Sequence, residues 1–199
     1  IRDLVRSRGL GDVYKRQGWG RSDWFAETNI ADWNDDNAQE VATLFTKNVP
    51  TLTTAATQWD FSTIYSLNNN LDKLAHSAFS NETKQHWVGV NRFLRAMEYA
   101  KLVSNFGDVP YYQQPINPND KATLYRAFSP RLEVMDSVLA DIKYAMENVR
   151  IEDGEQGLNI TRDLVYAYAS RIFLFEGTWQ KYHSPQNAEA AAKYLQAAK

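Results

Sequence analysis

The segment 18–36 combines side chains that suit a ligand with one apolar face and a polar rim. An indole ring offers a flat apolar platform, while amide, carboxylate and guanidinium groups offer directional hydrogen bonds. A sugar ring presents a face of C–H groups and a rim of hydroxyls, so this mixture predicts a carbohydrate site. The alternative is that the Trp rings anchor the segment to the fold. The candidate residues are Arg21, Asp23, Trp24, Trp33, Asn34 and Asp35.

Bond cleavage is a competing interpretation of the same segment, and we do not favour it. Asp35 and Asp36 are adjacent, whereas glycoside cleavage needs two carboxyl groups about 5–10 Å apart on opposite sides of the bond. We interpret them as part of a solvated loop before a helix N-terminus, where the helix dipole stabilises a carboxylate. His76, His86 and His183 lack the spacing of metal ligands, and the sequence contains no nucleophile-elbow, phosphate-loop or dinucleotide motif. We predict no catalytic residue, metal ligand or cofactor.

Composition limits the classes of partner. The chain has 199 residues, a formal net charge of −2 and no Cys, so disulfides and thiolate metal sites are excluded. Basic and acidic residues are mixed along the sequence, which argues against nucleic acid as a partner. No run of about eighteen apolar residues occurs, so we expect no membrane-spanning helix.

The first seventeen residues differ from the remainder. They carry five basic and two acidic side chains, a net charge of +3, which leaves −5 for the rest of the chain. They also lack an initiator Met. We interpret residues 1–17 as a segment foreign to the fold and residues 18–199 as one helical domain truncated at both ends. The alternative for residues 1–17 is a native, frayed basic helix.

Apolar residues recur at helical spacing in several segments, and local signals predict where each helix begins and ends. Gly107 and Gly177 are interpreted as C-terminal stops. Thr161 and the Ser-Pro pairs at 129–130 and 184–185 are interpreted as starts. The predicted helices cover residues 37–48, 57–75, 81–106, 130–149, 162–176 and the chain from 185 onward.

Helix–loop–helix pairs in series predict an all-α fold, a tetratricopeptide-like solenoid of helical pairs with long irregular loops. The helix that begins near residue 185 is expected to lack a partner. Asp108 is expected to bind backbone N–H groups or an arginine such as Arg95. Four residues at the stop marked by Gly177 are expected to lock a turn between helices: Glu176, Trp179, Lys181 and Tyr182.

Four blocks of sequence, in the same order, resemble the SusD/RagB family of outer-membrane glycan-binding lipoproteins. The sequences GDVP at 107–110 and FEGTW followed by KYH at 175–183 are the most specific parts of the likeness. The blocks are Trp59…Tyr65…Asn69-Asn70; RFLRAMEYAKLVSNFGDVPYY at 92–112; Arg126…Ser129-Pro130-Arg131 with Val134-Met135-Asp136 and Asp141-Ile142; and Ile160-Thr161…Ala167…Arg171 followed by IFLFEGTWQKYH at 172–183.

The resemblance implies a protein that captures oligosaccharides at the surface of a Bacteroidota-type bacterium without cleaving them. It would pass them to a SusC-type TonB-dependent transporter in the outer membrane. Full-length members of the family carry a lipoprotein Cys and a large C-terminal portion, and neither is in this sequence, so a membrane attachment would use a lipid anchor outside it. The alternatives are a peptide-binding RagB-type relative, a protein-interaction scaffold that binds no sugar, and a glycoside hydrolase fragment.

Overall fold

The computed structural model describes residues 59–117, 119–154, 159–184 and 187–199. The chain divides into two compact units, Ile1–Trp59 and Asp60–Lys199, and the second contains the described helices. Three predictions lie outside the described residues: the foreign segment 1–17, the carbohydrate segment 18–36 and the helix 37–48.

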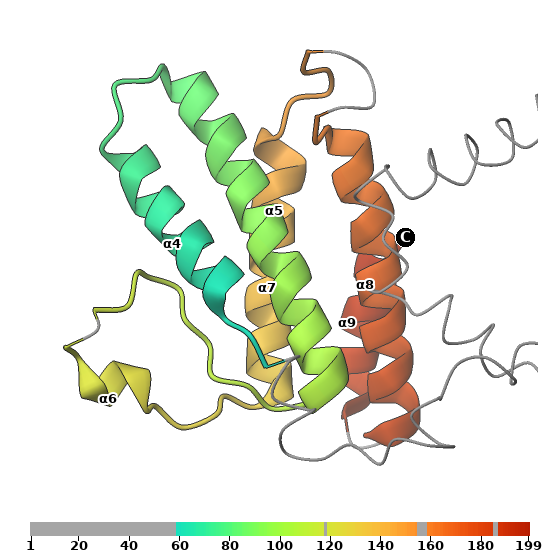
Figure 1. The fold of residues 1–199 in the computed structure, drawn as a ribbon. Coiled ribbons are helices and arrows are strands. Elements are labelled where there is room, and N and C mark those ends of the chain that lie inside the picture. Colours follow the sequence, from blue (N-terminus) through green and yellow to red (C-terminus); the bar gives the residue numbers. More distant parts are fainter. Residues whose placement is uncertain (1–58, 118, 155–158, 185–186) are drawn as a thin grey trace, which may run out of the picture. The chain divides into compact units, whose positions relative to one another are not determined.

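Helices dominate the described part of the chain. They are α4 (Ser62–Ala75), α5 (Asn81–Phe106), α6 (Lys121–Leu124), α7 (Arg131–Asn148), α8 (Arg162–His183) and α9 (Ala188–Ala197). In Figure 1 the long helices lie side by side, and the loop that carries α6 projects next to α4. Extended pairing in these ranges is limited to an isolated bridge between Val109 and Ser129. The predicted all-α, tetratricopeptide-like fold is confirmed.

Helix α5 is the central element, since it packs against both α4 and α7. Its first turn is capped by Ser80, whose hydroxyl accepts the backbone N–H of Thr83 at 3.2 Å. It ends at Gly107, whose φ of 76° lies in the region that favours glycine, so the predicted stop is confirmed. Because it has neighbours on two sides, its buried surface is wider than one stripe and includes Phe93 and Tyr99.

Helix α7 begins differently from the prediction. Pro130 occupies the capping position and Arg131 is the first helical residue, while Ser129 pairs with Val109. The cap comes from another part of the chain, because the Asp108 carboxylate accepts the backbone N–H of Arg131 at 2.8 Å. Asp108 therefore binds a backbone N–H group, as expected, and not Arg95.

The predicted end of helix α8 is wrong. The helix continues through Gly177 to His183, so Glu176, Trp179, Lys181 and Tyr182 lie within a helix and not in a turn. Its start also differs in detail, because Thr161 takes the capping position without a side-chain capping hydrogen bond. A glycine inside a helix costs about 1 kcal/mol relative to alanine. Here a Cβ on residue 177 would lie 2.7 Å from Leu195 Cγ, so the glycine allows α9 to approach.

Helix α9 has a partner, contrary to expectation. It packs antiparallel on α8: near its N-terminus Asn187 donates to the side chain of Gln180 at 3.3 Å, and near its C-terminus Ser170 donates to the Ala198 carbonyl at 2.7 Å. Its first helical residue is Ala188, three positions after the predicted start. None of the described helices combines the length and the apolar character needed to cross a membrane.

A buried histidine lies where the turn after α7 meets α5. Nδ1 of His86 accepts the backbone N–H of Arg150 at 3.2 Å, and Nε2 lies 3.4 Å from Asp153 Oδ2 without a well-aligned hydrogen bond. Arg150 also pairs with Glu82 at 2.7 Å. Burial holds the pKa of His86 below its ordinary value of 6.5, against the opposing effect of the Asp153 carboxylate.

We expect His86 to make the stability of the fold depend on pH. Below about pH 6.5 the unfolded chain takes up a proton at this residue that the folded chain resists, so the free energy of unfolding falls as the pH is lowered. Urea unfolding between about pH 7.5 and about pH 5.5 would measure this slope. The variant His86→Gln, which cannot titrate, should have a shallower slope. An identical slope in the variant would show that other groups cause the pH dependence.

Candidate functional site

The predicted carbohydrate residues Arg21, Trp24, Trp33, Asn34 and Asp35 lie outside the described residues, as does Asp23. Their assignment therefore stays a prediction. The described part of the chain offers a second candidate, the connection between α5 and α7, which we call the α6 loop and define as residues 107–130.

The two ends of the α6 loop are held together where it leaves the helices. Val109 and Ser129 exchange two backbone hydrogen bonds of 3.3 and 3.0 Å. The short helix α6 forms farther along the loop, and the Asp120 carboxylate accepts the backbone N–H of Thr123 at 3.2 Å and its hydroxyl at 2.6 Å. The α6 loop therefore leaves and rejoins the helices at neighbouring points and contains local structure of its own.

A buried arginine anchors the outgoing part of the loop. Arg95, only 2% exposed, donates from Nε and Nη2 to the two oxygens of Asp141 at 2.8 and 2.9 Å. Its Nη1 donates to Asn68 Oδ1 at 2.8 Å and to the Gln113 carbonyl at 2.9 Å. Burial alone would lower the pKa of Arg95, but the pair with Asp141 raises it above its ordinary value. One charged group thus joins α4, α5, α7 and the loop.

Further side chains fix the backbone of Tyr112 from both sides. The Tyr99 hydroxyl accepts the N–H of Tyr112 at 2.6 Å and donates to its carbonyl at 3.2 Å. Asn68 Nδ2 donates to the same carbonyl at 2.9 Å. The ring of Phe61 packs edge-to-face on the ring of Tyr112, with centroids 5.8 Å apart. Burial raises the pKa of Tyr99 far above its ordinary value, so its hydroxyl remains a hydrogen-bond donor at any physiological pH.

The returning part of the loop is fixed to the outgoing part. Arg126 Nη1 donates to the Tyr111 carbonyl at 2.6 Å, and the Tyr112 hydroxyl donates to the Leu124 carbonyl at 3.2 Å. These bonds tie the outgoing and returning parts of the loop together, and such pre-organisation reduces the ordering cost of binding. Binding residues are often carried on loops that a rigid scaffold positions in this way.

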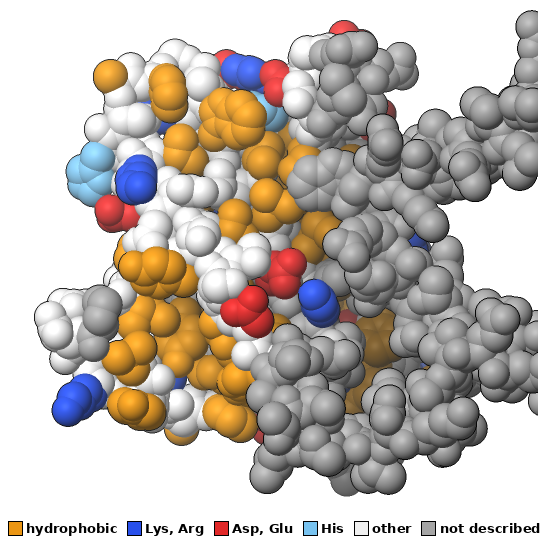
Figure 2. Space-filling view, in the orientation of Figure 1, with side chains coloured by type: hydrophobic (Ala, Val, Ile, Leu, Met, Phe, Trp, Pro, Cys, Tyr) orange, Lys and Arg blue, Asp and Glu red, His pale blue; other side chains and the backbone are white. Residues whose placement is uncertain are grey.

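Apolar and amide side chains share the exposed surface of this loop. Leu124, Tyr125 and Phe128 are exposed, as is Tyr65 on the adjoining helix α4. Figure 2 shows hydrophobic side chains gathered over the α6 loop and the neighbouring end of α4. The same loop also exposes four amides, Gln113, Gln114, Asn117 and Asn119.

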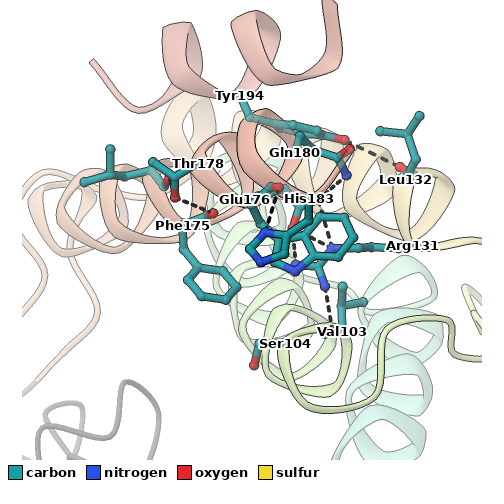
Figure 3. Close-up of polar contacts among 12 residues, drawn as sticks. Val103, Ser104, Arg131, Leu132, Phe175, Glu176, Thr178, Gln180, His183 and Tyr194 are labelled. Atoms are coloured by element: carbon teal, nitrogen blue, oxygen red, sulfur yellow. Dashed lines mark hydrogen bonds and ion pairs between the residues drawn. The ribbon is translucent and has the colours of Figure 1, made fainter. Parts of the chain in front are cut away.

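A second buried ion pair holds the base of α7 against α8. Arg131 donates to both carboxylate oxygens of Glu176, the shortest contact being 2.6 Å, and to the Val103 carbonyl at 3.2 Å. Gln180 donates to Glu176 at 2.7 Å (Figure 3). The guanidinium carbon of Arg131 lies 3.8 Å from the centroid of the Trp179 ring. This cluster fixes the point at which the α6 loop rejoins the helices.

The described residues contain no group of three or more His, Asp or Glu side chains arranged to hold a metal ion.

Helix α8 exposes a second set of apolar side chains, namely Tyr166, Leu174, Phe175 and Tyr182. These exposed rings can stack on a flat apolar face of a ligand.

Solved structures with the same fold support a common architecture. A SusD-like protein from Bacteroides fragilis NCTC 9343 aligns with a TM-score of 0.59 at 22% identity, over 73% of this chain and 27% of its own. A laminarin binding SusD-like protein aligns with a TM-score of 0.52 at 22% identity, over 68% and 27%. Surface glycan-binding protein A from Bacteroides uniformis gives 0.51 at 18% identity, over 72% and 31%. This chain thus spans less than a third of the length of each.

Sequence comparison identifies the family directly. No curated protein matches the chain. Residues 11–174 match the model of a SusD-like family described as starch-binding and associating with the outer membrane, which confirms the resemblance noted from the four sequence blocks. Because this match covers most of the chain, the chain belongs to the SusD-like family, whose members are glycan-binding proteins rather than enzymes.

Proposed function

We propose that this chain is part of a non-catalytic protein that binds oligosaccharides at the cell surface. It would lie at the outer membrane and deliver its ligand to a SusC-type TonB-dependent transporter. The observation that carries the proposal is the family match over residues 11–174, which includes the predicted Trp-rich segment and the described helices from α4 to the first part of α8. The confirmed helical-pair fold supports it, because such scaffolds present extended surfaces to partners.

Within this function, we propose that Arg21, Trp24, Trp33, Asn34 and Asp35 contact the sugar. The two indole rings would stack on the C–H faces of sugar rings, and the polar side chains would bind hydroxyl groups at the rim. Residues 1–17 would take no part in binding, in keeping with their different charge.

Affinity gel electrophoresis tests this site. Trp24→Ala and Trp33→Ala are each expected to reduce the retardation of the protein by a polysaccharide that retards the wild type, with far-ultraviolet circular dichroism unchanged. Trp87→Ala is a matched control, because Trp87 is an exposed indole on helix α5. Unchanged retardation of both site variants would remove the sugar site from this segment.

Further assays on the same protein distinguish the alternative functions. Turnover of a glycan that is abolished by Asp35→Asn would identify a hydrolase, and binding of peptides but not glycans would identify a RagB-type relative. Purification from native outer membranes tests the partnership, since a SusC-type barrel should co-purify with the protein. A protein that binds neither sugar nor peptide but retains the barrel would be an interaction scaffold.

A further inference from the structure

We propose that the α6 loop forms a second sugar-stacking subsite, centred on the ring of Tyr125. The inference rests on the proposed glycan-binding function and adds to it a contact surface separate in sequence from residues 18–36. Its ligand would be the C–H face of a neutral sugar ring, bordered by the amide groups of the same loop.

The position of Tyr125 is fixed although its side chain is 84% exposed. Its backbone N–H donates to the Lys121 carbonyl at 3.0 Å at the end of α6. The next residue, Arg126, is held to the Tyr111 carbonyl at 2.6 Å. A ring presented from a constrained backbone can stack on a ligand with little loss of loop entropy.

The charges of the loop point to a neutral ligand. Its two acidic residues, Asp108 and Asp120, balance its two basic residues, Lys121 and Arg126. Three of these four are engaged within the loop or at its base, since Asp108 caps α7, Asp120 caps α6 and Arg126 binds a loop carbonyl. The exposed hydrogen-bonding groups that remain are mainly amides, which can both donate to and accept from hydroxyl groups.

The same features fit a protein partner less well. A stable protein interface takes about 20–30 residues a side and has an apolar centre with a polar rim. The described residues of the α6 loop expose three large apolar side chains, Leu124, Tyr125 and Phe128, and the loop also exposes four amides. Exposed rings on a loop that also carries amides can offer a sugar ring stacking on one face and hydrogen bonds at the edge.

The test is affinity gel electrophoresis and isothermal titration of the protein with amylopectin, laminarin and the other polysaccharides of a glycan array. For a polysaccharide that the wild type binds, Tyr125→Ala is expected to raise Kd roughly threefold to tenfold, the size of one lost aromatic contact. Tyr125→Phe should bind like the wild type, because the ring is retained. Tyr166→Ala is the control: Tyr166 is an exposed tyrosine near the start of α8, beside the end of α7 remote from the loop.

The possible outcomes separate the proposed glycan-binding function from the proposed subsite at Tyr125. Failure of the wild type to bind any polysaccharide would overturn the proposed function and the subsite with it. Binding by the wild type with unchanged affinity of Tyr125→Ala would overturn the subsite alone. A Tyr125→Ala variant that keeps its glycan affinity but loses its co-purifying barrel would assign the loop to a protein partner and would also overturn the subsite.

Discussion

Replacing Asp141 with alanine is expected to lower the free energy of unfolding by about 3–5 kcal/mol, the usual cost of removing one partner of a buried ion pair. Asp141 is buried, accepts hydrogen bonds from Arg95 at 2.8 and 2.9 Å, and forms an ion pair with Arg92 at 3.0 Å. Without it, the guanidinium of Arg95 keeps its charge in the interior and loses its main counter-charge. Chemical denaturation followed by circular dichroism measures the change.

The α6 loop should loosen in the same variant. Asp141 orients the guanidinium of Arg95 that binds the Gln113 carbonyl, so limited proteolysis of the variant is expected to cut within residues 107–130 faster than in the wild type. Glu82→Ala is the matched control, because it also removes a carboxylate from an arginine, but from an exposed pair with Arg150 that solvent screens. Equal losses of stability in Asp141→Ala and Glu82→Ala would mean that burial adds nothing to the Arg95 pair.

The helices could be predicted from the sequence because burial of one face leaves a periodic pattern of apolar residues. Helix α5 shows this, since its start near Asn81 and its stop at Gly107 were both predictable from local signals. The spacing of apolar residues along a helix does not show which other helices it packs against. Arg95 and Asp141 are 46 positions apart, and no local signal joins them. The available hint was a charged residue inside each apolar stripe, which marks a candidate buried ion pair without naming its partner.

The candidate surfaces were less predictable for a related reason. Residues 18–36 could be singled out by side-chain chemistry alone, without any knowledge of their geometry. Tyr125 could not, because a loop has no period and the exposure of a ring depends on packing by distant elements. Asn68 on α4 and Tyr99 on α5 bind the backbone of Tyr112 in the same loop. These residues come together only in the folded chain.

Gly177 shows how a local signal can mislead. A glycine after an apolar helical stripe predicts a C-terminal stop, and Gly107 obeys that rule with a positive φ. Gly177 instead lies within α8, where the absence of a Cβ allows α9 to pack closely. The two glycines differ in backbone conformation and in what packs against them, and the sequence around Gly177 does not reveal its contact with α9.

Gly177→Ala is therefore expected to destabilise the fold by about 1–2 kcal/mol, although alanine is the better helix former by about 1 kcal/mol. The new Cβ would lie 2.7 Å from Leu195 Cγ and 2.9 Å from the Leu195 backbone nitrogen. A side chain can turn away, but the backbone contact requires α9 itself to shift from α8. Chemical denaturation of the variant, followed by circular dichroism, measures the net effect.

A double-mutant cycle isolates the cause of this loss. Leu195→Ala removes the side-chain part of the clash and leaves the backbone part, so the double variant should be less destabilised than the two single variants together. If Gly177→Ala instead raised the unfolding midpoint, the helix propensity of alanine would be the only effect present. Helix α9 would then lie too far from residue 177 to require a glycine there.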